Sequence, residues 1–194
     1  PPNGVPAPVT VNLQGDERPE IVVSLNDGFL HAFRANAEEL WRFNYTHGKA
    51  VMYASEPGGA DLNRAGSLEA IFSTYGAPAV LDSGYLMIAD RFGTLLHDVP
   101  LPSPGSNGNG NGAPAAPAVG DLDGDGQLEV FVQTFDHGMD VFRIPGSAEN
   151  CLLWPTARGG PLRTGAPSGE WMLAEIFSDG FESNGTSAWS VTAP

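Results

Sequence analysis

Short apolar runs separated by turn residues dominate the hydrophobic pattern of the chain. In residues 20–25 (EIVVSL) and 29–33 (FLHAF) the apolar runs last only five or six positions, which is typical of β-strands rather than helices. Residues 26–28 (Asn-Asp-Gly) lie between these runs and form a strong hairpin signal. The layout returns in residues 129–144, where EVFVQT and MDVFRI flank an Asp-His-Gly turn. The pattern therefore predicts antiparallel hairpins joined by tight turns.

The composition supports an all-β chain with a buried interior. Of the 194 residues, 25 are Gly and 17 are Pro, which favours many short elements over long helices. The hydrophobic fraction of 41% is ordinary for a folded domain. We therefore expect a mainly β protein with one core or two small ones.

Three stretches resemble one another when they are aligned on an Ala-Pro pair. They begin at Ala7 (APVTVNLQGDERPEIVVSLNDGFLHAF), Ala77 (APAVLDSGYLMIADRFGTLLHDV) and Ala116 (APAVGDLDGDGQLEVFVQTFDHGMDVF). Units of about 40 to 55 residues with four short antiparallel strands are typical of β-propeller blades, and an ordinary β-sandwich is the alternative. Because closed propellers have roughly four to eight blades, three units predict either missing blades in a longer chain or pairing with another copy.

The stretch GDLDGDGQLEVFV, residues 120–132, places four carboxylates next to a predicted strand. Numbered from its first aspartate, the loop offers carboxylates at positions 1, 3, 5 and 9 and a backbone carbonyl at position 7. Ca²⁺ takes about six to eight oxygens from such groups, and carboxylates this close repel one another strongly without a cation. The predicted metal ligands are Asp121, Asp123, Asp125, the Gln127 carbonyl and Glu129.

Two other interpretations fit parts of this loop. An EF-hand also begins with Asp-x-Asp-x-Asp-Gly, but it requires a bidentate Glu at position 12, where this chain has Val132. The residues after Glu129 also alternate as a strand and not as a helix. A solvated acidic turn without metal is the second alternative. The pattern favours a Ca²⁺ loop that joins two strands.

The stretch APAVGDLDGDGQLEVFV resembles the FG-GAP or VCBS-type repeat of integrin α-chain propellers and of many secreted bacterial proteins. In those repeats a D-x-D-x-D-G-x-x-D/E loop binds Ca²⁺ between the first two strands of a blade. The resemblance is strong over residues 116–144, weaker over 7–44 and weakest over 77–99. It implies a partial β-propeller of about three four-stranded blades, with Ca²⁺ held by the ligands named above.

The other two units are degenerate at the ligand positions that the resemblance implies. The middle unit has only Asp82 and Ser83 before its strand, so we expect no site there. The first unit has only two carboxylates, so we expect weak calcium binding or none. Its residues are Asn12, Gln14, Asp16, the Arg18 carbonyl and Glu20.

The repeat and the composition divide the chain into five parts. Residues 1–50 are a predicted blade with a degenerate loop, 51–102 a degenerate blade, 103–115 a Gly/Asn/Pro-rich flexible loop, 116–168 a blade with the intact loop and a closing segment, and 169–194 a C-terminal tail. The G-x-G-x-G spacing in the third part is a weak nucleotide signal, because no strand precedes it and no helix follows.

Charge and cysteine content narrow the function further. Lys and Arg number 9 against 23 Asp and Glu, a formal net charge of −14, so we expect no nucleic-acid partner. Cys151 is the single cysteine, so an internal disulfide is not possible. A membrane-spanning helix needs about 20 consecutive apolar residues, and no apolar run of the sequence approaches this length. The final IFSDGFESNGTSAWS is similar to a short tail of secreted proteobacterial proteins. We therefore expect a secreted, extracellular protein, with the bacterial cell surface as one location.

Catalysis finds little support in the sequence. No Gly-x-Ser-x-Gly occurs, and His31, His47, His97 and His137 are scattered. We expect His31 and His97 to be packed in strands and the other two to be solvated. The sequence favours a non-catalytic module for adhesion, binding or assembly, with a protein or carbohydrate ligand at the blade loops and open edges suited to a homo-oligomer. The alternative is an accessory or catalytic propeller of a larger secreted polysaccharide lyase or hydrolase.

Overall fold

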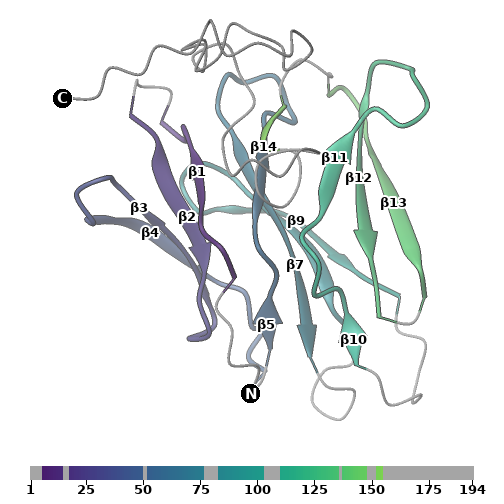
Figure 1. The fold of residues 1–194 in the computed structure, drawn as a ribbon, viewed down its shortest axis with the longest axis horizontal. Coiled ribbons are helices and arrows are strands. Elements are labelled where there is room, and N and C mark those ends of the chain that lie inside the picture. Colours follow the sequence, from purple (N-terminus) through teal and green to yellow (C-terminus); the bar gives the residue numbers. More distant parts are fainter. Residues whose placement is uncertain are drawn as a thin grey trace, which may run out of the picture.

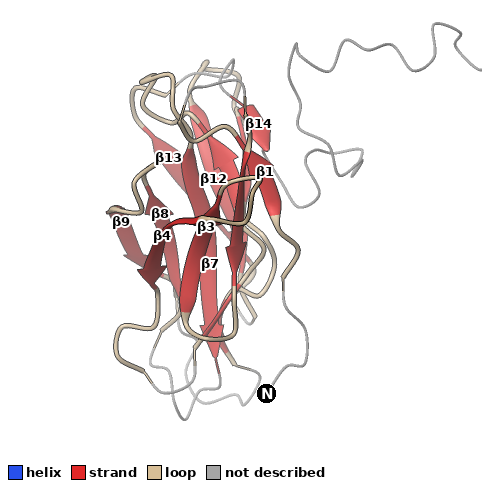
Figure 2. Cartoon of the chain, turned by 90° about the vertical axis from the view of Figure 1, so that its left-hand side faces the viewer, coloured by secondary structure: helices blue, strands red, loops and turns tan. Residues whose placement is uncertain are grey.

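The structure is a computed structural model, and it is all-β. Its described residues contain fourteen strands in three antiparallel sheets and no helix (Figure 1; Figure 2). The predicted all-β class is therefore confirmed. Cys151 and the tail 169–194 lie outside the described residues. The described residues are 6–14, 18–49, 52–76, 83–102, 110–135 and 137–147, with the backbone of 152–154.

The first sheet is a four-stranded meander, in which strands adjacent in sequence are adjacent in space. Residues 26–28 form the predicted hairpin between its second and third strands. The Leu25 amide donates to the Phe29 carbonyl at 2.9 Å, and Gly28 has a φ of 92°, which glycine adopts without strain. The strands are β1 (Val9–Val11), β2 (Glu20–Ser24), β3 (Phe29–Phe33) and β4 (Glu39–Asn44).

The middle sheet has seven strands, and most of them are organised around β7 (Glu69–Gly76). Four strands, β6 to β9, form a meander like that of the first sheet. Two short strands, β5 and β10, pair with the end of β7, and β14 pairs with β6. The other bounds are β5 (Tyr53–Ala54), β6 (Gly58–Ala60), β8 (Tyr85–Ala89), β9 (Leu95–Pro100), β10 (Asn111–Gly112) and β14 (Leu152–Trp154).

The third sheet has three described strands, where the sequence predicts four. They are β11 (Ala118–Gly120), β12 (Leu128–Gln133) and β13 (Met139–Ile144). The next described strand, β14, belongs instead to the middle sheet, where Leu152 pairs with Ala60 on the open edge of β6. Among the described strands β13 therefore has one partner, β12.

The middle unit starts earlier than the alignment on Ala77 predicts, so that alignment is wrong by one strand. Its first meander strand is β6, and β8 is its third strand rather than its second. Residues 58–60 read Gly-Gly-Ala, which carries no β-strand pattern, and this hid the strand from the sequence. The loop equivalent to the acidic loop is therefore residues 61–68.

Part of the Gly-rich tract is packed into the sheet, contrary to its prediction as a flexible loop. Asn111 and Gly112 pair with β7, and Ala113 is fully buried. Gly112 has a φ of 87°, and a Cβ atom there would lie 2.1 Å from the Thr74 carbonyl oxygen. Glycine is needed at this position because two backbones approach closely. Residues 103–109 of the tract lie outside the described residues.

Two hydrophobic cores lie on the two faces of the middle sheet. Phe72 and Met87 pack into the core shared with the first sheet, and Ile71 and Ile88 pack into the core shared with the third sheet. All four side chains are at most 2% exposed. Because successive side chains of a strand point to opposite faces, the middle sheet is buried between its two neighbours (Figure 1).

Candidate metal centre

A buried glutamate is the first residue of β2 and of β7 and the second residue of β12, and it closes the loop that precedes each strand. Each carboxylate accepts a hydrogen bond from a leucine amide seven residues earlier, and each glutamate is at most 4% exposed. The pairs are Leu13–Glu20 at 2.8 Å, Leu62–Glu69 at 2.8 Å and Leu122–Glu129 at 2.9 Å. The sequence predicts Glu129 only as a metal ligand. The shared Asp-Leu and Leu-Glu pairs of residues 61–69 and 121–129 are the signal for this second role.

The acidic loop between β11 and β12 is organised around Asp121. Its two carboxylate oxygens accept hydrogen bonds from the Gly124 amide at 2.7 Å and from the Gly126 amide at 2.8 Å. Both glycines have left-handed φ values, 77° and 82°, which let the chain wrap around this side chain. The amide of Gly126, followed by that of Gly124, lowers the pKa of Asp121. This carboxylate therefore stays ionised under mildly acidic conditions.

Three of the five predicted ligands converge. Asp121, Asp123 and Glu129 each offer a carboxylate oxygen, and these atoms lie within 4.8 Å of one another. Asp125 lies outside this group of three, and its Oδ1 accepts from the Gln127 amide at 2.9 Å. The Gln127 side chain bonds to Asp125 and accepts from the Gly146 amide at 3.2 Å, so it connects the loop to the end of the third sheet.

A cationic side chain faces these carboxylates. Arg143 lies on β13 directly opposite Glu129 in the register of the sheet. Its guanidinium contacts Asp123, and Nη1 lies 3.2 Å from Asp125 Oδ2. Its Nε lies 3.4 Å from Glu129 Oε1, which is buried and has no hydrogen-bond partner. Nothing in the local sequence of the loop indicates this contact, because it depends on the pairing of β12 with β13.

In the middle loop, residues 61–68, an aspartate also accepts hydrogen bonds from backbone amides, but most of the other acidic side chains are replaced. Asp61 accepts from the Ala65 amide at 3.0 Å and from the Gly66 amide at 2.8 Å. The bond from Gly66 corresponds to the one from Gly126 to Asp121, while the other donor lies one residue later than Gly124 does in the acidic loop. Arg64, with a φ of 60°, stands where the acidic loop has a glycine, and Ala65 stands where it has Asp125. This loop therefore keeps its conformation without the acidic set. Asp82 and Ser83, which the sequence places at the ligand positions of the middle unit, are not in this loop. Asp82 lies outside the described residues.

The degenerate first loop is described in part. Asn12, Gln14, Arg18 and Glu20 belong to the described residues, and Asp16 does not. The Glu20 carboxylate is buried and is engaged by the Leu13 amide. Weak or absent calcium binding by this loop stays a prediction.

The histidines have different environments. His31 is 5% exposed and lies 2.7 Å from Glu39 Oε1, so its packed role is confirmed. His137 has a side chain that is 53% exposed, as predicted, while that of His47 is 30% exposed. The prediction that His97 is packed is wrong, because β9 is the outer strand of its sheet and the side chain is exposed.

Comparisons with known proteins assign this chain to no family. In the part of the chain that the structure describes, no helix has the length and apolar character needed to cross a membrane. No protein-family profile matches the sequence, and no curated protein matches it either.

Proposed function

We propose that this chain is a non-catalytic, extracellular β-propeller module in which the loop from Asp121 to Glu129 binds a structural Ca²⁺. The observation that carries the proposal is the convergence of Asp121, Asp123 and Glu129, with the buried Glu129 Oε1 lacking a hydrogen-bond donor. A buried carboxylate oxygen without a hydrogen bond is costly, and a bound cation would satisfy it. The role we infer is adhesion, ligand binding or assembly at the cell surface or beyond it.

The donor set suits a hard cation. All of the converging atoms are carboxylate oxygens, which Ca²⁺ prefers, and no nitrogen or sulfur ligand lies in the group. The loop holds four carboxylates, and one guanidinium, that of Arg143, contacts three of them, so an excess of negative charge remains. A divalent cation would offset this excess and relieve the repulsion between the aspartates.

The metal would stabilise the loop rather than create it. The loop of the middle sheet is held by hydrogen bonds to its own aspartate and glutamate, Asp61 and Glu69, although it has Ala65 at a ligand position. Backbone hydrogen bonds therefore suffice to form the turn. The Ca²⁺ would add a link between the start of β12 and the loop before it, which supports a structural role over a sensing role.

The sheet arrangement supports the propeller part of the proposal. Antiparallel meanders that pack face to face in series are the layout of propeller blades. The two cores on the faces of the middle sheet provide this packing twice. Further blades, from a longer chain or from a second copy, would cover the outer faces of the first and third sheets.

Thermal unfolding in 1 mM Ca²⁺ and in excess EGTA tests the metal site. A ligand present at about 100 times its Kd stabilises a protein by about 2.7 kcal/mol, or about 5–10 °C for a chain of this size. We expect such a rise for the natural sequence. We expect no rise for the double variant Asp123→Asn with Asp125→Asn.

The control removes two carboxylates elsewhere, with Glu38→Gln and Asp98→Asn, so that the net charge matches. This control should keep the full calcium-dependent rise. Equal Tm values with Ca²⁺ and EGTA in the natural sequence, or an undiminished rise in the loop variant, would contradict the proposal.

A further inference from the structure

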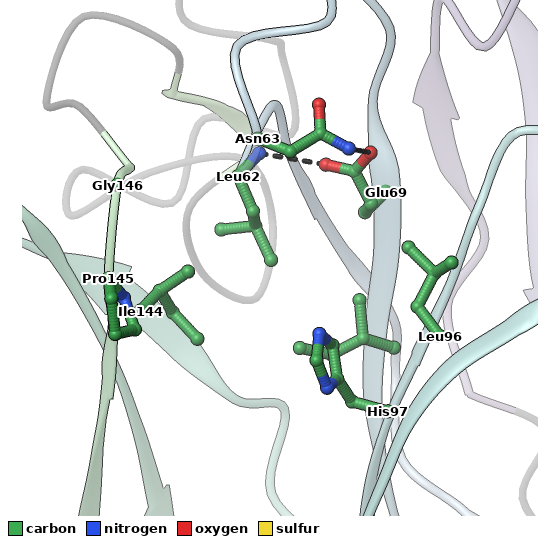
Figure 3. A pocket seen from close by; sticks show the side chains of 9 residues that line it. Leu62, Asn63, Glu69, Leu96, His97, Ile144, Pro145 and Gly146 are labelled. Atoms are coloured by element: carbon green, nitrogen blue, oxygen red, sulfur yellow. Dashed lines mark hydrogen bonds between the residues drawn. The ribbon is translucent and has the colours of Figure 1, made fainter.

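A pocket of about 330 Å³ lies between the middle and third sheets (Figure 3). One side is formed by β7, β8 and β9, and the other by the end of β13 and the turn that follows it. The loop before β7 completes the lining. Figure 3 shows His97 opposite Ile144 and Pro145, with Leu96 beyond His97 on the side of Glu69. The pocket lining includes the side chains of Leu62, Ile88, Leu96, His97, Ile144 and Pro145.

The equivalent position between the first and middle sheets is filled by a tryptophan. Trp41, on β4, donates its indole N–H to the Arg91 carbonyl at 2.7 Å. Its ring lies against Gly93, because a Cβ atom there would come within 2.7 Å of Trp41 Cε3. Trp41 thus packs on the turn that follows the third strand of the next sheet.

The strand register makes His97 the counterpart of Trp41. Trp41 pairs with Ala32 and His97 pairs with Ile88, and each pair lies next to a register shift at the end of the third strand. The turns that these two side chains face also correspond. Gly93, in the turn against which Trp41 packs, has a φ of 78°, and Gly146, in the turn that lines the pocket, has a φ of 83°. The pocket is therefore the space that an indole occupies one sheet earlier.

We propose that this pocket binds an aromatic side chain of tryptophan size, carried by a partner polypeptide. The volume lies at the lower end of the range of ligand pockets, about 300–1,000 Å³, and so suits one ring system. A polypeptide is the occupant because the counterpart inside this molecule is itself a side chain on an extended strand. Leu96, which is 43% exposed, provides apolar surface at the opening.

Shape and apolar contact, rather than hydrogen bonding, select the occupant. The Glu69 carboxylate already accepts from the Leu62 amide and from the Asn63 side chain at 2.9 Å. The Ile144 carbonyl, the counterpart of the Arg91 carbonyl, already accepts from Ser147 Oγ at 2.6 Å. A ring would therefore be held mainly by Ile88, Leu96 and Ile144.

Methyl NMR of the full chain tests this proposal with three probes. They are the capped peptide Thr-Val-Trp-Thr-Val, the same peptide with Leu in place of Trp, and N-acetyl-tryptophanamide. We expect the Trp peptide to give saturable ring-current shifts at the methyl groups of Leu62, Ile88, Leu96 and Ile144, and the Leu peptide to bind at least tenfold more weakly. Absent shifts, equal binding of the Leu peptide, or equally tight binding of the free amide would overturn the assignment.

Filling the pocket from within gives a second test. His97→Trp should place an indole in the pocket and weaken binding of the Trp peptide at least tenfold. His137→Trp adds an indole at an exposed turn and should leave binding unchanged. If His97→Trp does not fold, His97→Phe tests the same point. Undiminished peptide binding by the folded filling variant would contradict the proposal.

Discussion

Replacing Arg143 with methionine should tighten Ca²⁺ binding and destabilise the calcium-free protein. The guanidinium contacts Asp123, Asp125 and Glu129, so Ca²⁺ must displace it in order to reach these oxygens. Methionine keeps an apolar stem of similar length and removes the charge. The side chain therefore acts as an internal competitor for the metal, and it also offsets the repulsion between carboxylates when the metal is removed.

The size of the effect follows from the exposure of the contacts. The Arg143 side chain is 51% exposed, and solvent-exposed ion pairs contribute about 0.2–1 kcal/mol each. Three such contacts, of which that with Glu129 is the least exposed, give about 1–2 kcal/mol in total. The Kd for Ca²⁺ should fall by about five- to thirty-fold. In EGTA the Tm of the variant should be lower than that of the natural sequence.

Calorimetric titration with CaCl₂ at low ionic strength measures this change directly. Arg34→Met is the matched control: it removes one arginine from the corresponding turn of the first sheet, where the side chain pairs with Glu38 at 2.7 Å. Net charge falls equally in both variants, so long-range attraction of Ca²⁺ cannot explain a difference between them. An unchanged or higher Kd for Arg143→Met would refute the competition.

Three further predictions concern the stability of the sheets. Burial, and then the nearby Asp61, raises the pKa of Glu69. Protonated Glu69 therefore contributes stability that is fully present below about pH 4.3 and is lost as the pH rises through the pKa of the folded state. In urea unfolding from pH 4 to 8, Glu69→Gln should make the free energy of unfolding depend less on pH, and an unchanged pH dependence would contradict this. Gly112→Ala should cost about 3 kcal/mol because its Cβ would collide with the Thr74 carbonyl, whereas Gly126→Ala, with nothing within 4 Å, should cost about 1 kcal/mol by the same measurement. Phe72→Ala, at a fully buried site in the first core, should lower the free energy of unfolding by about 3–5 kcal/mol in chemical denaturation, and a loss under 1 kcal/mol would contradict its placement.

Sequence patterns were sufficient to predict those features of the structure that depend on a few neighbouring residues. The hairpin at residues 26–28 needs only two short apolar runs and a glycine that takes a positive φ. The acidic loop needs only spaced carboxylates and two glycines, and it joins two strands, β11 and β12, as the sequence predicts. The β6 strand was missed because Gly-Gly-Ala has no alternation and its strand character comes from pairing with β7.

The sequence by itself determined the all-β class, the tight turns and the position of the carboxylate loop, because these depend on backbone preferences and spacings within about ten residues. Tertiary structure decided that Arg143 faces that loop, that buried glutamates close all three loops, and that a pocket opens beside His97 where the preceding sheet has Trp41. These features depend on strand register and on the packing of one sheet against the next. Alternation along a strand shows that one face is buried, but the side chains that cover this face come from distant parts of the chain.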